Sequence, residues 1–189
     1  RIMHILNRNS KKGSRKNIYA HYDIGNEFFK LWLDPSMTYS GALFKKPEEE
    51  LSKAQENKYE NILQKLNLKV GDHILEVGCG WGGFMEYAAR QGVKVTGVTI
   101  SKEQYEFAKK RLSQYEGIAE VRLQDYREIT GEYSQIVSIE MFEALGSEYW
   151  KKYFKILHSI LKPGGKMIIQ TITINNNDYS SYRRCSDFI

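Results

Sequence analysis

The sequence contains little cysteine and little histidine, which bounds the chemistry that the chain can carry. Its 189 residues include two cysteines, Cys79 and Cys185, and four histidines. Two cysteines cannot build a disulfide framework, and no His/Cys cluster has the spacing of metal ligands. We therefore expect a protein of a reducing compartment that has no metal site.

Long apolar runs and a secretory signal pattern are also missing. No stretch approaches the roughly 18–20 apolar residues that cross a bilayer. Hydrophobic residues make up 41% of the chain and charged residues 27%, as in ordinary soluble domains. A cytoplasmic location is therefore the default expectation, and the length suits one domain with its own core.

Acidic residues are absent from the chain before Asp23, so a basic segment at 1–16 contributes to the net charge of +5. Such a segment suits the phosphates of nucleic acid or anionic lipid headgroups. A solvated terminus without a partner is the alternative. The basic residues are Arg1, Arg8, Lys11, Lys12, Arg15 and Lys16.

Residues 17–66 read as an aromatic-rich cap followed by a helix. We expect a short helix at 26–33, stopped by Asp34 and Pro35, and an amphipathic helix at 51–66. The aromatic density predicts a cap over a pocket, and a strap that holds the segment on the core is the alternative. The aromatics are Tyr19, Tyr22, Phe28, Phe29, Trp32, Tyr39 and Phe44.

Residues 67–189 alternate strand and helix patterns, which predicts an α/β fold with a doubly wound, mainly parallel sheet. A polar tail at 175–189 is all that follows the last predicted strand, which would leave an open sheet edge. We therefore expect a fragment whose C-terminal strands are missing. The predicted strands are 73–77, 93–98, 119–123, 135–139 and 166–174, and helices are expected at 83–91, after Ser101 and at 148–161.

A glycine-rich run, Glu76-Val-Gly-Cys-Gly-Trp-Gly-Gly83, joins the first core strand to a helix. Glycines let the main chain approach a ligand, and open α/β sheets bind ligands at this end of the strand. Glu76 repels a phosphate and can pair with a cation, which favours S-adenosylmethionine (SAM) over NAD. The spacing is G-x-G-x-G rather than G-x-G-x-x-G. The predicted cofactor residues here are Glu76, Gly78, Cys79, Gly80, Trp81 and Gly82.

No acid follows the second strand to hold a ribose, so we expect Gln104 to take that role. Ser101 and Gln104 have the spacing of a capping box. After the third strand, Asp125 is placed to accept from the adenine amino group and Tyr126 to lie on its ring. A simple turn cap is the alternative for Asp125.

Five segments together resemble the cyclopropane fatty acid synthase family, which includes mycolic acid cyclopropane synthases and related lipid methyltransferases. Similarity runs from about residue 17 to 189. It implies a Rossmann-like class I SAM-dependent methyltransferase fold and methyl(ene) transfer to the cis double bond of an unsaturated phospholipid acyl chain, giving a cyclopropane or a methyl- or methylene-branched chain. The segments are HYDIGNEFF (21–29), WLDPSMTYS (32–40), EVGCGWGG (76–83), GVTIS (97–101) with Gln104, and EMFEALG (140–146).

By position, the resemblance implies that Tyr39 and Ser40 contact the methionine end of SAM. It implies ribose contacts for Thr99 and Gln104, with Ile100 and Ser101 in the same cofactor-binding segment. Glu143 resembles a glutamate that helps to hold a bicarbonate ion acting as base.

Two positions depart from the pattern of the cyclopropane-forming members. Gly41 stands where they usually have cysteine, and Gln170 where they usually have histidine. Both positions hold bicarbonate in those enzymes, so an anion site can survive here or be altered. The candidate catalytic residues are His21, Tyr22, Gly41, Glu143 and Gln170.

Methylation of a double bond leaves a carbocation on the acyl chain, which aromatic faces stabilise. Tyr22, Phe142 and Tyr149 are candidates for this role, with plain core packing as the alternative. A base must then remove a proton, and Glu143 is our candidate to position it. A surface glutamate is the alternative reading.

The expected partners are unsaturated phospholipid acyl chains, with the basic segment touching the anionic inner membrane surface. No nucleic-acid partner is expected, because the aromatics do not alternate with Lys or Arg. The sequence leaves a homodimer open. Two other functions stay open: methylation of another substrate, a soluble small molecule or nucleic acid, and SAM or lipid binding without catalysis.

Overall fold

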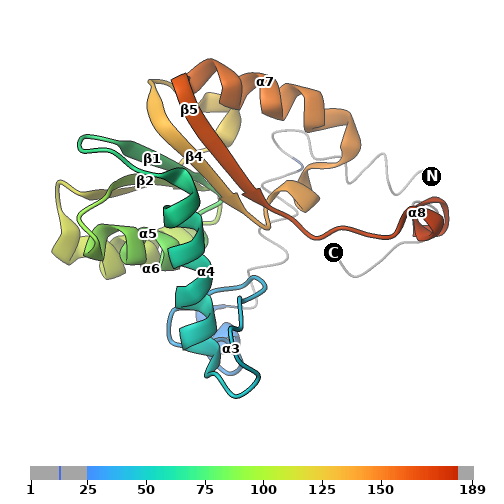
Figure 1. Ribbon diagram of the computed structural model, residues 1–189, viewed down its shortest axis with the longest axis horizontal. Helices are drawn as coiled ribbons and strands as arrows, with labels where there is room; N and C mark the ends of the chain where they lie inside the picture. Colours follow the sequence, from blue (N-terminus) through green and yellow to red (C-terminus); the bar gives the residue numbers. More distant parts are fainter. Residues whose placement is uncertain (1–12, 14–24, 183–189) are drawn as a thin grey trace.

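The computed structural model of the chain describes Gly13 and residues 25–182 (Figure 1). Its centre is a five-stranded sheet in the order β3-β2-β1-β4-β5, and every neighbouring pair is parallel. This confirms the predicted α/β fold with a parallel sheet. The strands are β1 His73–Val77, β2 Lys94–Thr99, β3 Ala119–Leu123, β4 Tyr133–Ile139 and β5 Leu161–Gln170.

Helices cover both faces of the sheet, as the doubly wound prediction requires (Figure 1). One face carries α4 Leu51–Leu66, α5 Gly83–Arg90 and α6 Lys102–Arg111, and the other carries α7 Trp150–Ile160. The short 3-10 helices are η1 Leu112–Tyr115, η2 Tyr126–Glu128, η3 Phe142–Leu145 and η4 Ser147–Tyr149.

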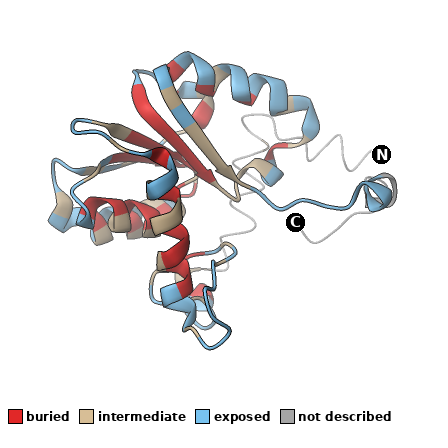
Figure 2. Ribbon diagram, in the orientation of Figure 1, coloured by how far each residue is buried: buried red, intermediate tan, exposed pale blue. Residues whose placement is uncertain are grey.

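Two hydrophobic clusters lie on the two sides of the sheet, because successive strand residues point to opposite faces. Ile74 of β1 belongs to the cluster with α4, α5 and α6, whereas Leu75 belongs to the cluster with α7. Val137 and Ile136 of β4 divide in the same way. Figure 2 shows these buried strands between helices whose outer surfaces are exposed.

A third, smaller cluster joins the N-terminal segment to the glycine loop. It consists of Phe29 from α3 Asn26–Phe29, Met37 and Trp81, with Leu33 and Phe107 against it. The aromatic segment thus packs on the core at the loop, as the alternative reading of a strap expects, and a cap over a pocket stays a prediction. The helix at its start ends at Phe29 rather than Leu33.

The end of the described chain differs from the sequence prediction. The last strand begins at Leu161, directly after α7, and ends at Gln170 instead of residue 174. The pairing of β4 with β5 shifts register between Tyr133 and Gln135, which accommodates the Pro-Gly-Gly stretch within the strand. Residues expected to form a polar tail instead include the helix α8 Asn176–Tyr182.

Candidate cofactor and substrate site

The carboxyl ends of four parallel strands bring the predicted site segments to one edge of the sheet. The glycine loop follows β1, Thr99 ends β2, Glu140 follows β4 and Gln170 ends β5. This edge is where open α/β sheets bind ligands. The predicted site residues on these strands therefore share one edge, although they are spread over almost a hundred positions of the sequence.

The glycine loop leaves room for a ligand at its centre. Gly80 has a φ of 52°, and a β-carbon added there would meet no atom within 4 Å. Residues that carry a side chain rarely adopt this backbone conformation. Because glycine has no side chain, the main chain itself borders the open space. Gly82 is the N-cap of α5 and makes no side-chain cap bond, and the first N–H groups of a helix have no partner within the helix.

Glu76 supplies a buried carboxylate directly before the loop. It is 3% exposed, and its Oε2 makes no hydrogen bond within the described chain. Burial raises the pKa of Glu76 to about 8, and the nearby Lys58 ammonium opposes this shift. An unpaired buried acceptor at this place fits a ligand that brings a positively charged donor, such as the amino group of SAM.

The side chain of Trp81 fastens the cap to the loop. Its Nε1 donates to Oδ1 of Asn26 at 2.6 Å, and its ring lies 4.9 Å from that of Phe29. Arg111 adds a second connection, because its Nη1 donates to the carbonyl oxygens of Ser36 at 2.6 Å and Trp81 at 3.1 Å. Trp81 therefore acts through packing here, and the indole is 2% exposed.

The turn at Tyr39–Gly41 is held by a polar stripe on α4. Nε2 of Gln55 donates to the carbonyl oxygen of Ser40 at 2.9 Å, and Nζ of Lys58 donates to its hydroxyl at 2.6 Å. Lys58 is 3% exposed, and burial lowers its pKa to about 8 against the attraction of Glu140, Glu76 and Asp34. The ring of Tyr39 packs on Phe29 and Trp32.

Sequence reasoning missed Lys58, although a signal existed. Lys58 stands four residues after Ala54 and four before Ile62, both of which are buried. It therefore lies on the inward face of α4, where an unneutralised ammonium is costly. A lysine at such a position indicates a charged partner at the site.

The predicted ribose contacts lie together at the end of β2. Thr99 donates its hydroxyl hydrogen to Oε1 of Gln104 at 2.8 Å, which leaves the amide NH₂ as a donor for a ligand. Ser101 caps α6 by accepting from the backbone N–H of Gln104 at 3.3 Å. Half of the predicted capping box is present, since the Gln104 side chain turns to Thr99 instead. Ile100 lies between them and is half-buried.

Asp125 and Tyr126 are engaged within the protein. Asp125 accepts from the backbone N–H of Arg127 at 2.9 Å and forms a two-pronged ion pair with its guanidinium group. It thus caps η2, as the alternative reading held. The ring of Tyr126 lies edge-on to that of Tyr153 within a core cluster. Their adenine contacts stay predictions.

The two positions that depart from the family pattern meet at one side chain. Oε1 of Glu140 accepts from the backbone N–H of Gly41 at 2.9 Å and from Nε2 of Gln170 at 2.8 Å. Because these donors are already satisfied, the bicarbonate implied by the resemblance does not fit between them. Glu143 lies nearby and accepts from the backbone N–H of Ile172.

Other predicted residues lie elsewhere or outside the description. Phe142 packs among aromatic side chains of α7, stacked on Trp150 at 5.1 Å, and Tyr149 ends η4. Cys79 is buried in the loop, and burial raises its pKa well above the usual value. His21, Tyr22 and Cys185 lie outside the described part, as does the basic segment 1–16 apart from Gly13.

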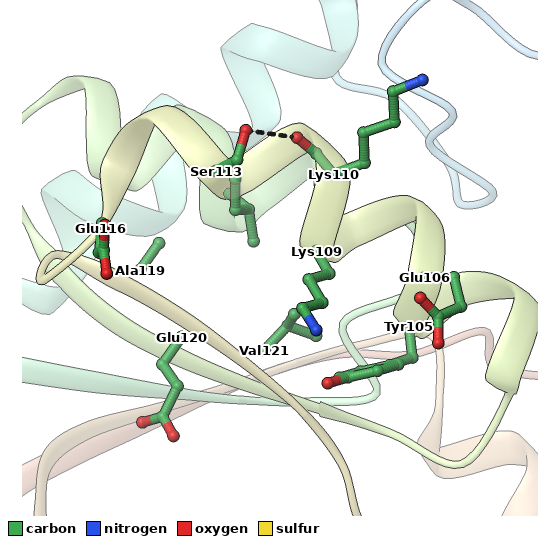
Figure 3. A pocket seen from close by; sticks show the side chains of 10 residues that line it. Tyr105, Glu106, Lys109, Lys110, Ser113, Glu116, Ala119, Glu120 and Val121 are labelled. Atoms are coloured by element: carbon green, nitrogen blue, oxygen red, sulfur yellow. Dashed lines mark hydrogen bonds between the residues drawn. The ribbon is translucent and has the colours of Figure 1, made fainter.

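A groove of about 580 Å³ lies between α6, η1 and β3 (Figure 3). It is at the edge of the sheet formed by β3, and β5 forms the other edge. Charges of both signs line it, including Lys109 and Glu120. It contains none of the predicted site residues. We assign it no ligand.

Comparison with known proteins identifies close relatives. The sequence model of the mycolic acid cyclopropane synthetase family matches residues 9–189. A probable fatty acid methyltransferase, Rv3720 of Mycobacterium tuberculosis, is 43% identical over 92% of this chain and 41% of its own length. The cyclopropane-fatty-acyl-phospholipid synthase of Escherichia coli K12 is 40% identical over 92% of this chain and 45% of its own length.

A solved structure agrees with these matches. Mycolic acid cyclopropane synthase CmaA1, complexed with SAH and CTAB, superposes with a TM-score of 0.82 at 35% identity. The superposition covers 89% of this chain and 60% of that one. The chain thus spans less than half the length of the two curated relatives named above. Among the described residues, no helix is both long and apolar enough to traverse a bilayer.

Proposed function

Because the chain belongs to the mycolic acid cyclopropane synthetase family, we propose that it forms the cofactor-binding part of an enzyme that alkylates unsaturated fatty acyl chains of phospholipids. The substrate is the cis double bond of the chain. The product is a cyclopropane ring or a methylene branch, and a separate reduction can convert the methylene branch to a methyl branch. The observation that carries the proposal is the buried Glu76 carboxylate, with an unpaired oxygen, directly before the open glycine loop.

The residues around the loop suit SAM. In this proposal Glu76 provides an acceptor for its amino group, Gln104 provides a donor for the ribose, and Tyr39 and Ser40 contact its methionine end. SAM supplies an electrophilic methyl group when it is bound. The chain has to hold the double bond in line with that methyl and to exclude water, because an isolated alkene is a weak nucleophile.

The aromatic cap supports the exclusion of water. Phe28, Trp32 and Tyr39 form a connected set of rings beside the turn, and each is between 42% and 46% exposed. Apolar rings with exposed faces at this place suit an acyl chain better than a polar substrate. Aromatic faces also stabilise an acyl-chain cation by about 0.5–2 kcal/mol each.

The last requirement is removal of a proton from that cation. Glu143 lies at the carboxyl edge of the sheet and binds the main chain just after Gln170. We propose that it positions the end of β5 and adds negative charge beside the cation. The basic segment 1–16 serves, in this proposal, as a contact with the anionic membrane surface.

One experiment separates this function from its alternatives. The protein, produced at its natural length, is incubated with SAM and vesicles of unsaturated phosphatidylglycerol, and SAH and lipid masses are measured. We expect SAH formation together with a lipid mass gain of one CH₂. SAM binding without SAH formation favours a non-catalytic homologue, and SAH formation with a soluble small molecule or RNA alone favours another methyltransferase.

A further inference from the structure

The carboxylate of Glu140 lies where three distant segments of the sequence converge. Its Oε1 accepts from the backbone N–H of Gly41 and from the side-chain amide of Gln170. The same Gln170 nitrogen donates to the carbonyl oxygen of Gly41 at 3.2 Å. One carboxylate oxygen is therefore fixed by two neutral donors at the carboxyl edge of the sheet.

The backbone conformation of Glu140 helps to hold its carboxylate between Gly41 and Gln170. Its φ of 47° is uncommon for a residue with a β-carbon. Its N–H donates to the carbonyl oxygen of Gln170 at 2.9 Å, so the turn after β4 stays tied to β5. A β-carbon at Gly41 would come within 3.3 Å of Oε1, which means that the small residue at 41 leaves room for the carboxylate.

The surroundings leave the second oxygen of Glu140 available. Oε2 makes no hydrogen bond within the part of the chain that the structure describes, and the residue is only half-buried. The buried Lys58 ammonium attracts both Glu140 and Glu76. A carboxylate with one fixed oxygen and one open oxygen can accept a proton.

We propose that Glu140 is the proton acceptor of the reaction and that its carboxylate replaces a free anion at this site. The inference rests on the proposed function. In the step, the acyl-chain cation loses a proton to Oε2 of Glu140. The electron pair of the broken C–H bond forms the last C–C bond of a cyclopropane ring. If a hydride shift first moves the cation to the methylated carbon, the same electron pair forms the C=C bond of a methylene branch, and Glu140 then releases the proton to solvent.

The test uses the protein at its natural length in buffer freed of carbon dioxide, with SAM and unsaturated phosphatidylglycerol vesicles. We expect wild-type turnover to be the same with and without added bicarbonate. Glu140→Gln should lower turnover by about 100-fold or more, because the amide cannot accept the proton. Added bicarbonate should not restore it, because the amide still fills the space.

Glu140→Gly provides the sharper comparison. Glycine tolerates the positive φ and frees the donors at Gly41 and Gln170 for a small anion. We expect it to be as slow as Glu140→Gln without bicarbonate and to recover in part when bicarbonate is added. SAH affinity, measured by calorimetry, should be unchanged in both variants, which shows that the fold and the cofactor site persist. Glu103→Gln, on the exposed start of α6, is the matched control.

Three outcomes overturn the inference. Wild-type turnover that requires added bicarbonate shows that a free anion is the acceptor. Full turnover by Glu140→Gln shows that the carboxylate is dispensable. A wild-type protein that binds SAH but forms none with any unsaturated vesicle refutes the proposed function, and the inference fails with it.

Discussion

The ammonium group of Lys58 donates a 2.6 Å hydrogen bond to the hydroxyl group of Ser40, and this bond joins α4 to the turn predicted to contact the methionine end of SAM. The same ammonium is attracted by Glu76 and Glu140, which lie at the ends of neighbouring strands. A single buried cation thus connects the cofactor loop, the turn and the edge of the sheet.

Replacing Lys58 by methionine should weaken cofactor binding. The change keeps most of the unbranched side chain but removes the bond to Ser40 and leaves two carboxylates without their cation. We expect SAH affinity to fall by about 10- to 100-fold, the equivalent of one charge-assisted hydrogen bond. Calorimetry measures it, and Lys53→Met, on the exposed side of the same helix, should bind like the wild type. Equal affinity of the two variants would contradict the role.

The stability of the free protein should depend on Glu76 between about pH 4.5 and pH 8. Its folded-state pKa is raised from 4.5 to about 8, so the folded protein keeps a proton that the unfolded chain loses. The stabilisation is complete below pH 4.5 and is lost as pH rises through 8. Melting temperatures at pH 5 and pH 8 should therefore differ more in the wild type than in Glu76→Gln. A parallel pH dependence in both would refute this.

Replacing Arg111 by lysine should loosen the cap. Lysine keeps the charge but has one nitrogen where the guanidinium group uses two, Nη1 for the carbonyl oxygens of Ser36 and Trp81 and Nη2 for that of Pro35. We expect the free energy of unfolding to fall by about 1–3 kcal/mol and amide hydrogen exchange at residues 34–39 to accelerate. The exposed Arg90→Lys should stay within about 0.5 kcal/mol of the wild type. Unchanged exchange in Arg111→Lys would show that Trp81 alone holds the cap.

Replacing Glu143 by glutamine should abolish turnover while SAM still binds. The amide can still accept from the main chain at Ile172, but the negative charge beside the acyl-chain cation is lost. We expect at least about a 100-fold loss of turnover with unchanged SAH affinity and melting temperature. A product yield equal to that of the wild type would show that Glu143 is a surface glutamate with no role in the reaction, which is the alternative interpretation.

Much of the fold was predictable because its signals are local. The bounds of α4, β1 and β3 match the expected ranges, since alternating or helical apolar patterns and glycines mark them. The predicted end of β5 was wrong, and helix α8 was not predicted. There the sequence carries a Pro-Gly-Gly stretch and polar residues, whose local preferences do not reveal a register shift or a terminal helix.

The candidate site was predictable only in part, for a different reason. The glycine loop and Gln104 could be predicted because they come just after the ends of predicted strands. The role of Glu140 could not, because it depends on contacts with Gly41 and Gln170, which lie far from it in the sequence. The pairing of β4 with β5 brings Glu140 and Gln170 together, and the turn at Gly41 reaches them through the bond from its N–H to Glu140. The two departures at Gly41 and Gln170 suggested an altered anion site, and the structure supplies the third member.

Lys58 attracts both Glu76 and Glu140, so a change at one of these carboxylates affects the other. A cationic group that arrives beside Glu76 competes with Lys58 for that carboxylate, so the attraction of Lys58 for Glu140 changes with it. We expect a ligand at the end of β1 to alter the electrostatic environment of Glu140 after β4, because Lys58 attracts both carboxylates.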